Sequence, residues 1–226
     1  MGTSMYEHGL ATLVLSELRG HTDRDDEIHE ALKRAVDVIL KAQNPVGGWR
    51  YNPDPIDADV SVTAMQLVAL ASARKAGILV PEQAIDKAVN YEKSCFDPAR
   101  GGFRYTPFPG EVGFSRSAAA VVSLMMCGRR QDVEVSEGLN YLTEHFESAL
   151  KGSDSGPYGH YYAAVANYLT GDEAFNKWYP RIRDVILASQ IRSGAFNMQH
   201  DDNAIGTQMA LIILGLPNGL VPAYQR

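Results

Sequence analysis

The chain has 226 residues, 45% of them hydrophobic, which suits one domain with a substantial buried interior. A formal net charge of -6 provides no basic surface, so nucleic acid is not an expected partner. Two cysteines without metal-ligand spacing exclude a disulfide scaffold. No apolar run reaches the roughly 20 residues of a membrane span, and the N-terminus has no signal-peptide pattern. We expect a single soluble domain over residues 1–226, and leave open its compartment and whether it is the C-terminal part of a longer protein with other domains.

Predicted helices of two kinds alternate along the chain. Those of the first kind are apolar on most faces, as expected for helices surrounded by other helices. In chain order they cover residues 5–18, 58–76, 115–127, 158–169 and 202–214, and the residues that end them are Gly20, Gly77, Gly128, Gly171 and Gly215. Those of the second kind have one apolar stripe and charges elsewhere, which is typical of outer helices. They cover 25–43 and 81–95 and include 139–150 and 175–186. No strand is expected, because the alternation typical of strands is missing.

A glycine-aromatic turn recurs before the apolar helices. Gly-Gly-Trp-Arg-Tyr at 47–51 is repeated as Gly-Gly-Phe-Arg-Tyr at 101–105, and 190–196 is a shortened copy. Self-similarity at this period predicts stacked helical hairpins. Helices that are apolar nearly all round favour a ring over an open solenoid, because the concave face of a solenoid would expose them to water. The sequence therefore predicts an all-α fold, an α/α toroid of inner and outer helices.

These turns resemble the Gln-Trp repeats of the squalene-hopene cyclase and protein prenyltransferase superfamily. The match is carried by Gln43, the glycines at 47 and 48, and Trp49; the sequence Asp59-x-Ser-Val-Thr that follows is similar to that of prenyltransferase/squalene-oxidase repeat proteins. The resemblance spans nearly the whole chain. It implies a toroid whose central cavity binds an apolar or isoprenoid-like ligand. The five predicted inner helices are one fewer than the six hairpins of a complete toroid of this family, which leaves the closure of the ring open.

Topology indicates where a site would lie. In consecutive hairpins all inner helices run the same way, so their N-termini and the positive ends of their dipoles meet at one mouth. Polar and aromatic residues at these helix starts are the candidate ligand-binding residues. They are His8, Tyr51, Tyr105, Ser115, His160, Tyr161, Asp201 and Asp202, with Ser117 in the same layer.

Asp57 and Asp59 are the candidate catalytic residues. The resemblance implies that Asp57-Ala58-Asp59-Val60 is related to the Asp-x-Asp-Asp acid of squalene-hopene cyclases, with Asp59 as the carboxyl that protonates an alkene, although Val60 replaces the third acid. Such an acid must be desolvated to stay protonated. The alternative is that Asp57 or Asp59 caps the following helix. We expect the cap, with a carboxyl pKa lowered by the helix dipole.

The histidines and a metal need separate consideration. His8 and His160 are expected to be hydrogen-bonded structural groups. Protein prenyltransferases hold zinc with Asp, Cys and His, and His160 resembles their histidine, but Cys127 lies at the far end of its helix. A zinc site of Asp59, His8, His160 and His200 is chemically feasible, yet the spacing does not require it. We expect no metal and no cofactor.

Three functions remain as hypotheses. The first is a terpenoid-cyclase-like toroid, with Asp59 as the acid if it catalyses a reaction. The second is a non-catalytic repeat module that binds a partner. The third is a carbohydrate-active toroid in which Asp59 and either Asp201 or Asp202 form a carboxylate pair.

Overall fold

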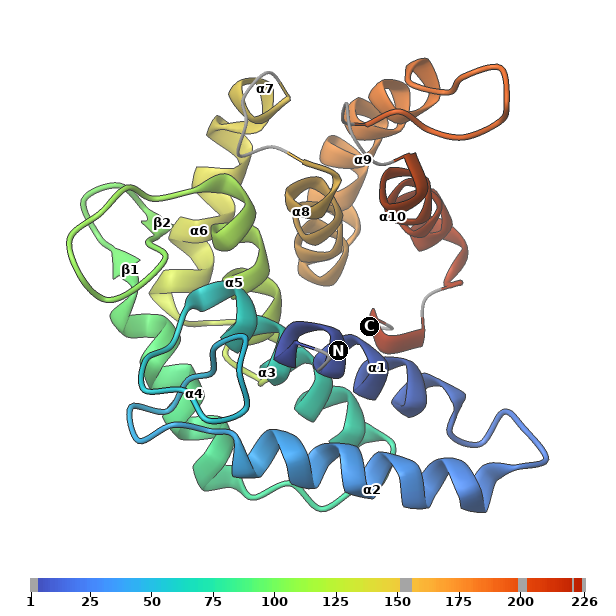
Figure 1. Ribbon diagram of the computed structural model, residues 1–226. Helices are drawn as coiled ribbons and strands as arrows, with labels where there is room; N and C mark the ends of the chain where they lie inside the picture. Colours follow the sequence, from blue (N-terminus) through green and yellow to red (C-terminus); the bar gives the residue numbers. More distant parts are fainter. Residues whose placement is uncertain (1–3, 151–155, 199–202, 221, 225–226) are drawn as a thin grey trace.

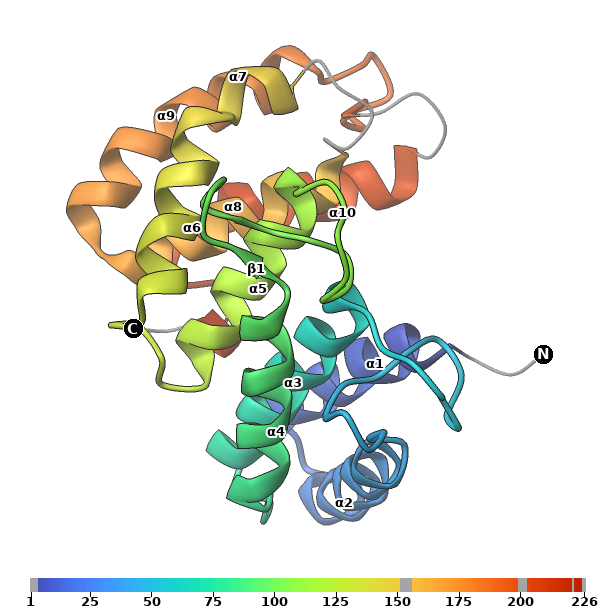
Figure 2. The same cartoon turned by 90° about the vertical axis from the view of Figure 1, so that its left-hand side faces the viewer.

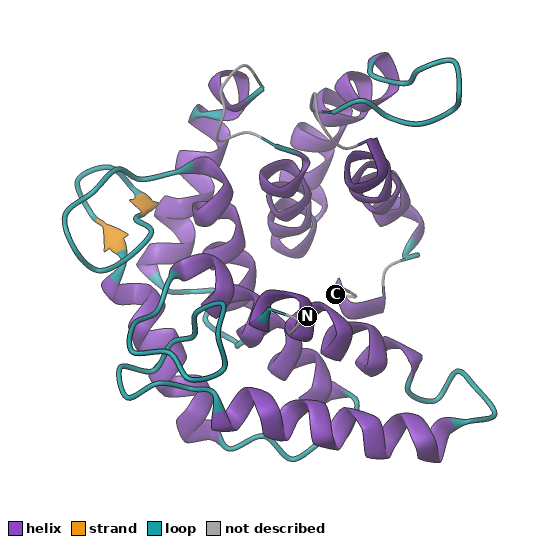
Figure 3. Ribbon diagram, viewed as in Figure 1, coloured by secondary structure: helices purple, strands orange, loops and turns teal. Residues whose placement is uncertain are grey.

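The computed structural model describes residues 4–150, 156–198, 203–220 and 222–224. Its α-helices are α1 (Met5–Leu18), α2 (Asp25–Lys41), α3 (Val60–Lys75), α4 (Glu82–Ser94), α5 (Phe114–Met126), α6 (Val133–Glu144), α7 (Phe146–Ala149), α8 (Pro157–Thr170), α9 (Asp172–Ala188) and α10 (Asn203–Gly215). Two short strands, β1 (Phe96–Asp97) and β2 (Gly102–Phe103), form an antiparallel pair, and 3-10 turns η1 (Leu216–Asn218) and η2 (Pro222–Tyr224) follow α10. None of the described helices has the length and apolar character needed to cross a membrane. Figure 3 shows that helix dominates the fold.

The helices form two layers. In the inner row α1 packs on α3, α3 on α5, α5 on α8 and α8 on α10. The helices α2, α4, α6 and α9 lie outside this row, as Figure 1 shows. In Figure 2 the outer helices α6 and α9 lie to one side of α8 and α10. The expected all-α toroid of inner and outer helices is confirmed.

The middle of the inner row is the core of the protein. Every residue of α3 from Val62 to Ala73 is buried, because α3 packs between α1 and α5 with α2 and α4 behind it. The helices α1 and α10 stand at the two ends of the row, and η2 packs on α1. The expectation that all apolar helices are enclosed therefore holds for the middle helices and fails for the exposed sides of the two end helices.

One hydrogen bond recurs in all three turns. The N–H of Trp49 donates to Thr63 Oγ1 (3.1 Å), that of Phe103 to Ser117 Oγ (2.8 Å), and that of Phe196 to Thr207 Oγ1 (2.9 Å). Each turn thereby attaches to the first turns of the inner helix that follows it. The repeat inferred from sequence is confirmed by this shared contact.

The backbone conformation of the turn explains why each copy contains a glycine. Gly47, Gly101 and Gly194 have φ values of 99°, 69° and 90°, a conformation that residues with a Cβ rarely adopt. Trp49 is fully buried and donates its indole N–H to the Ile39 carbonyl at 2.8 Å, which ties the turn to α2.

Two details differ from the sequence prediction. Phe96 pairs with Phe103 in the short β-ladder, where no strand was expected; the second turn folds back on the residues after α4, and the ladder satisfies their backbone groups. The third outer helix breaks at His145, so that α7 is separate from α6.

Candidate functional site

Asp59 caps α3, as the sequence predicted. Its backbone is extended, and its Oδ1 accepts a hydrogen bond from the Val62 N–H at 2.9 Å. Its own N–H donates to the Trp49 carbonyl, and the N–H of Val60 donates to the Tyr105 carbonyl. The turns of two successive repeats therefore hold the start of α3 from both sides.

The second carboxylate oxygen of Asp59 has no hydrogen-bond partner among the residues that the structure describes. Asp59 is fully buried, and Oδ2 lies 3.5 Å from Arg50 Nε, an ion-pair distance without hydrogen-bond geometry. Arg50 also pairs through Nη1 with the exposed Asp57 (3.2 Å), and its guanidinium lies 5.3 Å from the centre of the Tyr105 ring. The candidate acid is thus covered by one cation that it shares with Asp57.

Burial decides the titration of Asp59. Desolvation raises its pKa above the ordinary value, because the charged form loses its water. The Val62 N–H lowers the pKa, as do the Tyr105 hydroxyl and the Arg50 guanidinium, but their combined effect is smaller. The expected lowering by the helix dipole was therefore wrong. A carboxyl that caps a solvated helix end has a lowered pKa, because the helix dipole stabilises its charge. The start of α3 is instead enclosed by two turns, so burial outweighs the dipole.

The second repeat shows that the cap does not require a carboxylate. Gly113 occupies the position equivalent to Asp59: its N–H donates to Phe103 just as that of Asp59 donates to Trp49. The two backbones agree, with φ and ψ of -135° and 158° at Asp59 and -138° and 146° at Gly113. One inner helix of the same repeat therefore starts without any side-chain cap.

The two arginines of the repeated turn differ in the same way. Arg50 faces Asp57 and Asp59, whereas Arg104 bonds the carbonyls of Cys95 and Phe96. The charged cluster of Arg50 with two aspartates is therefore an addition to the first repeat. Sequence reasoning missed Arg50, although comparison of the two turns with their following residues could have found it.

A group of tyrosines connects the inner faces of α1, α8 and η2. Its members are Tyr6, Tyr158, Tyr161, Tyr162 and Tyr224. Ring centres are 6.0 Å apart for Tyr6 and Tyr158, 4.9 Å for Tyr158 and Tyr162, and 4.7 Å for Tyr161 and Tyr162. Tyr161 is hydrogen-bonded to Tyr224 through the two hydroxyls. The matching positions of Tyr6 and Tyr158, each two residues before a histidine, were a usable sequence signal.

Tyr158 links this tyrosine group to Asp59. Its buried hydroxyl has no hydrogen-bond partner within the described part of the chain. Burial raises the pKa of Tyr158, and the nearby charge of Asp59 adds to this effect. The Asp59 carboxyl is therefore near enough to Tyr158 for the two groups to interact electrostatically. The hydroxyls of Tyr51 and Tyr105, from the first and second turns, are 3.5 Å apart.

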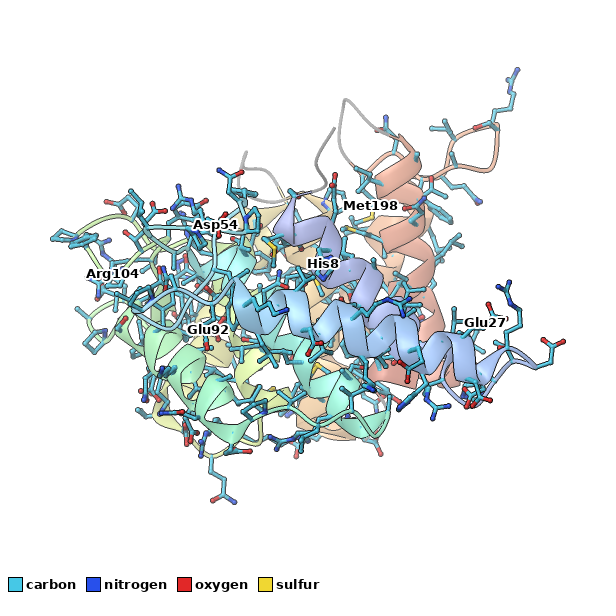
Figure 4. The ribbon with its side chains drawn as sticks, turned by 60° about the horizontal axis from the view of Figure 1, so that its bottom comes forward. His8, Glu27, Asp54, Glu92, Arg104 and Met198 are labelled. Atoms are coloured by element: carbon cyan, nitrogen blue, oxygen red, sulfur yellow. The ribbon has the colours of Figure 1, made fainter. Side chains whose placement is uncertain are left out.

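The histidines do not share one site. His8 Nε2 lies 2.9 Å from the Ala35 carbonyl and joins α1 to α2, as the expected structural group; Figure 4 shows His8 beside α2. His160 packs between Phe114 and Phe146, and burial lowers its pKa to about 4. Neither ring nitrogen of His160 has a hydrogen-bond partner in the described residues, so the expectation of a bonded group fails there.

The remaining candidates fall into two groups. Ser117 accepts the turn hydrogen bond, and Ser115 lies against Gly159 where α5 meets α8. Asp201, Asp202 and His200 lie outside the described residues. In the described part of the chain, no group of three His, Cys, Asp or Glu side chains is placed to hold a metal ion.

A buried glutamate was not anticipated from sequence. Glu92 on α4 is fully buried, and its Oε2 lies 2.6 Å from Ser123 Oγ, which also lies 2.8 Å from the Ala120 carbonyl. The Ser123 hydroxyl has one proton and can donate to only one of these two acceptors at a time. When it donates to the Ala120 carbonyl, the short contact with Glu92 requires that Glu92 is protonated. Burial raises the pKa of Glu92 well above its ordinary value, and a hydrogen bond donated by Ser123 opposes this only in part.

Three cavities lie away from Asp59. One of about 490 Å³ is lined by residues of α6, α8 and α9, including Asn167 and Trp178. One of about 380 Å³ lies at the C-terminal ends of α1 and α3, beside Glu17 and Ser72, and one of about 260 Å³ is lined by Ala71 and other residues. None of these three is lined by Asp59.

The helical layers and their recurring turns define the class of this protein, an α/α toroid, and comparison with solved structures agrees. A variant of the type II terpene cyclase MstE from Scytonema, in complex with geranylgeranyl dihydroxybenzoate, has 16% identity and a TM-score of 0.65; the match covers 97% of this chain and 64% of the cyclase. A second variant of that cyclase gives 17% identity and a TM-score of 0.62, with 97% and 65% covered.

An inactive variant of the alpha-1,6-mannanase GH76A of Salegentibacter sp. HEL1_6, in complex with alpha-1,6-mannotriose, has 10% identity and a TM-score of 0.67, with 98% of this chain and 77% of the mannanase covered. No protein-family model and no curated protein matches the chain. The chain spans less than two thirds of the length of the cyclase, and at these identities the likeness establishes the fold alone.

Proposed function

We propose that this chain is a terpenoid-cyclase-like toroid domain that binds an apolar, isoprenoid-like ligand against its tyrosine group, with Asp59 as the acid. The carboxyl of Asp59 carries the proposal. It is fully buried and uses only Oδ1 for the cap, and no described residue donates a hydrogen bond to its Oδ2. Because Gly113 starts α5 without a side-chain cap, capping alone does not account for a buried carboxylate at this position.

The chemistry follows from these groups. The raised pKa favours the protonated acid, and the π electrons of an alkene would take the Oδ2 proton to form a C–H bond and a carbocation. The remaining Asp59 carboxylate is stabilised by Arg50, 3.5 Å away. Faces of Tyr158 and its neighbours would stabilise the cation, since aromatic faces attract positive charge. Loss of a proton from the cation to solvent gives the product, and a proton taken up from solvent restores the Asp59 acid.

The test uses isoprenoid alcohols as probes. Geranylgeraniol and farnesol are titrated into the protein by calorimetry, and products are sought by mass spectrometry. We expect binding by the wild type and by Asp59→Asn, and a loss of product of at least about 100-fold in Asp59→Asn, the usual size of a general-acid contribution. Asp57→Asn is the control, because Asp57 is exposed and shares Arg50.

The outcomes separate the two parts of the proposal. Binding without product in the wild type would refute the acid and leave a ligand-binding module. No binding of either alcohol would refute the ligand class. Tight binding of alpha-1,6-mannotriose instead would favour the carbohydrate-active alternative, which the mannanase likeness suggests and which depends on Asp201 or Asp202 beside Asp59.

A further inference from the structure

The segment after α10 connects the two ends of the inner row. Within it, η1 packs on α10 and η2 packs on α1. Figure 1 shows the red end of the chain running from α10 towards α1, across the side of the arc where the row of inner helices stops. We call residues 216–220 and 222–224 the strap. The strap is the part of the described chain that links the last inner helix back to the first.

The strap places one aromatic ring in the tyrosine group. Tyr224 is 1% exposed, its ring centre lies 6.2 Å from that of Tyr161 in an edge-on arrangement, and the two hydroxyls are hydrogen-bonded to each other. The other members of the group, Tyr6, Tyr158, Tyr161 and Tyr162, belong to α1 and α8. Among these five tyrosines, Tyr224 is therefore the one supplied from outside the packed helices.

The strap is attached to the inner row only at its two ends. Leu216 and Ala223 are buried, whereas residues 217–220 are all exposed. The backbone N–H groups of Gly219 and Leu220 donate to carbonyls at the junction of α10 and η1, and thus within the same segment. Segments with few buried contacts open at a low cost in free energy. The strap is therefore the part of this region that opens most easily.

The tyrosine group is closely packed around the Tyr224 ring. Tyr161 and Tyr162 are 7% and 1% exposed, and none of the three cavities is lined by a tyrosine. A ligand that contacts the faces of these rings must therefore displace a side chain. Tyr161 and Tyr162 are fixed on α8, which packs between α5 and α10, whereas Tyr224 leaves with the strap. The cavity of about 380 Å³ already lies beside the strap, at Ala223.

We propose that the place of the Tyr224 ring beside Tyr161 is a binding site for a phenol, and that the strap fills this site reversibly. The chemistry of the ligand is that of the tyrosine side chain: a flat apolar ring edge-on to Tyr161, and one hydroxyl that shares a hydrogen bond with the Tyr161 hydroxyl. The ligand binds only when the strap has left, so its apparent affinity is reduced by the fraction of molecules in which the strap is closed. The site belongs to the tyrosine group of the proposed function, and the inference rests on that function only for an isoprenoid ligand; it does not require Asp59.

The probe is 4-methylphenol, which has the shape of the tyrosine side chain. Calorimetry measures its binding, and hydrogen exchange followed by mass spectrometry measures the opening of the strap. We expect weak binding by the wild type, with faster exchange of the strap amides in the presence of the probe, although ligand binding ordinarily slows exchange. Tyr224→Ala should bind the probe at least about 10-fold more tightly, because the strap no longer competes for the site.

Two further variants show whether the strap itself is responsible. Tyr224→Phe keeps the ring and loses the hydrogen bond to Tyr161, so its strap should exchange faster than that of the wild type without any probe, and its affinity should lie between those of the wild type and Tyr224→Ala. Leu220→Ser changes a 71% exposed residue of the strap and is the matched control, which should behave as the wild type does.

The outcomes are distinct for the strap and for the proposed function. Binding by Tyr224→Ala alone, or wild-type binding without faster exchange of the strap, would show that the strap is a fixed part of the fold and overturn the proposal. So would a folded Tyr224→Ala that does not bind the probe, or a Tyr224→Phe that matches the wild type in exchange and affinity. Farnesol should also bind Tyr224→Ala more tightly than the wild type. Farnesol that binds neither protein, with 4-methylphenol behaving as expected, would refute the isoprenoid ligand and support the strap.

Discussion

At the scale of single residues, Asp59 combines two roles that sequence reasoning treated as alternatives. One oxygen caps α3, and the other is buried beside Arg50 with no hydrogen bond from the described part of the chain. A cap needs one acceptor oxygen, whereas proton transfer needs the other oxygen and a raised pKa. The residue type alone does not distinguish a helix cap from a general acid, because both roles use the same carboxyl.

Replacement of Asp59 separates the cost of its burial from its value as a cap. Asp59→Asn keeps a capping oxygen and removes a buried carboxyl, so the free energy of unfolding at pH 7 should change by only a few tenths of a kcal/mol or rise. Asp59→Ala loses the cap and should cost about 0.5 to 2 kcal/mol. Urea unfolding measures both. A large loss in Asp59→Asn would mean that the ion pair with Arg50 stabilises the fold more than we infer.

Glu92 should make stability depend on pH. Its folded pKa is raised, so the folded state holds a proton that the unfolded state releases above its ordinary value of 4.5. Stability from this proton is complete below pH 4.5 and is lost as the pH rises through the folded pKa, with a slope approaching about 1.4 kcal/mol per pH unit. Glu92→Gln removes this slope and should be the more stable protein at pH 8.

Denaturant unfolding at pH 5 and pH 8 measures the Glu92 effect. Glu144→Gln, at an exposed glutamate that ends α6, is the matched control and should leave the difference between the two pH values unchanged. If wild type and Glu92→Gln lose stability equally between pH 5 and pH 8, Glu92 is not the protonated group.

At the scale of elements, the repeated turn is held by a hydroxyl from the following helix. The same bond occurs at Thr63, Ser117 and Thr207, although the aromatic residue is Trp in one turn and Phe in two, and donor and acceptor are 14, 14 and 11 residues apart. A turn N–H buried between two hairpins has no water to bond, so a partner must come from a side chain. This explains why a hydroxyl residue lies near the start of the inner helix that follows each turn.

Loss of this hydroxyl should cost most where the turn is most buried. Thr63→Val keeps the shape of the side chain and leaves the Trp49 N–H unpaired, which should cost about 1 to 3 kcal/mol. Thr207→Val, at a partly exposed position, should cost less, because water can replace the hydroxyl. Thermal or urea unfolding of the two variants gives the comparison. Equal losses at both sites would show that burial does not set the value of the bond.

Substitutions of Trp49 test how much its buried side-chain volume in the same turn contributes to stability. Its ring is fully buried, so Trp49→Ala should cost about 3 to 5 kcal/mol. Trp49→Phe keeps an aromatic ring and loses the bond to Ile39, and should cost less. An unchanged unfolding midpoint in Trp49→Ala would contradict the view that these turns brace the hairpins.

At the scale of the whole molecule, stability should be distributed along the inner row. A stack of hairpins is stabilised by contacts between neighbours, and an end hairpin has fewer of them. We expect amide hydrogens of α3 and α5 to exchange more slowly than those of α1 and α10, because opening an end helix breaks one inner interface and opening a middle helix breaks two. Hydrogen exchange followed by mass spectrometry measures this, and equal protection in all five helices would contradict it.

Much of this architecture could be predicted from the sequence. Hydrophobic periodicity identified inner and outer helices, glycines such as Gly77 and Gly128 marked helix ends, and the turn at 47–51 with its copies indicated the repeat. These signals are local: a helix end or a tight turn depends on the conformations open to a few neighbouring residues. The same local rule identified Asp59 as a cap.

Properties that depend on contacts between distant segments were decided only by the tertiary structure. The pKa of Asp59 depends on its enclosure by turns from two repeats, and the protonation of Glu92 on its burial against Ser123, neither of which is visible along the chain. His8 and His160 look like copies in sequence but face different elements. The exposure of α1 and α10 likewise follows from their places at the ends of the row, because burial is set by the number of neighbours a helix has and not by its composition.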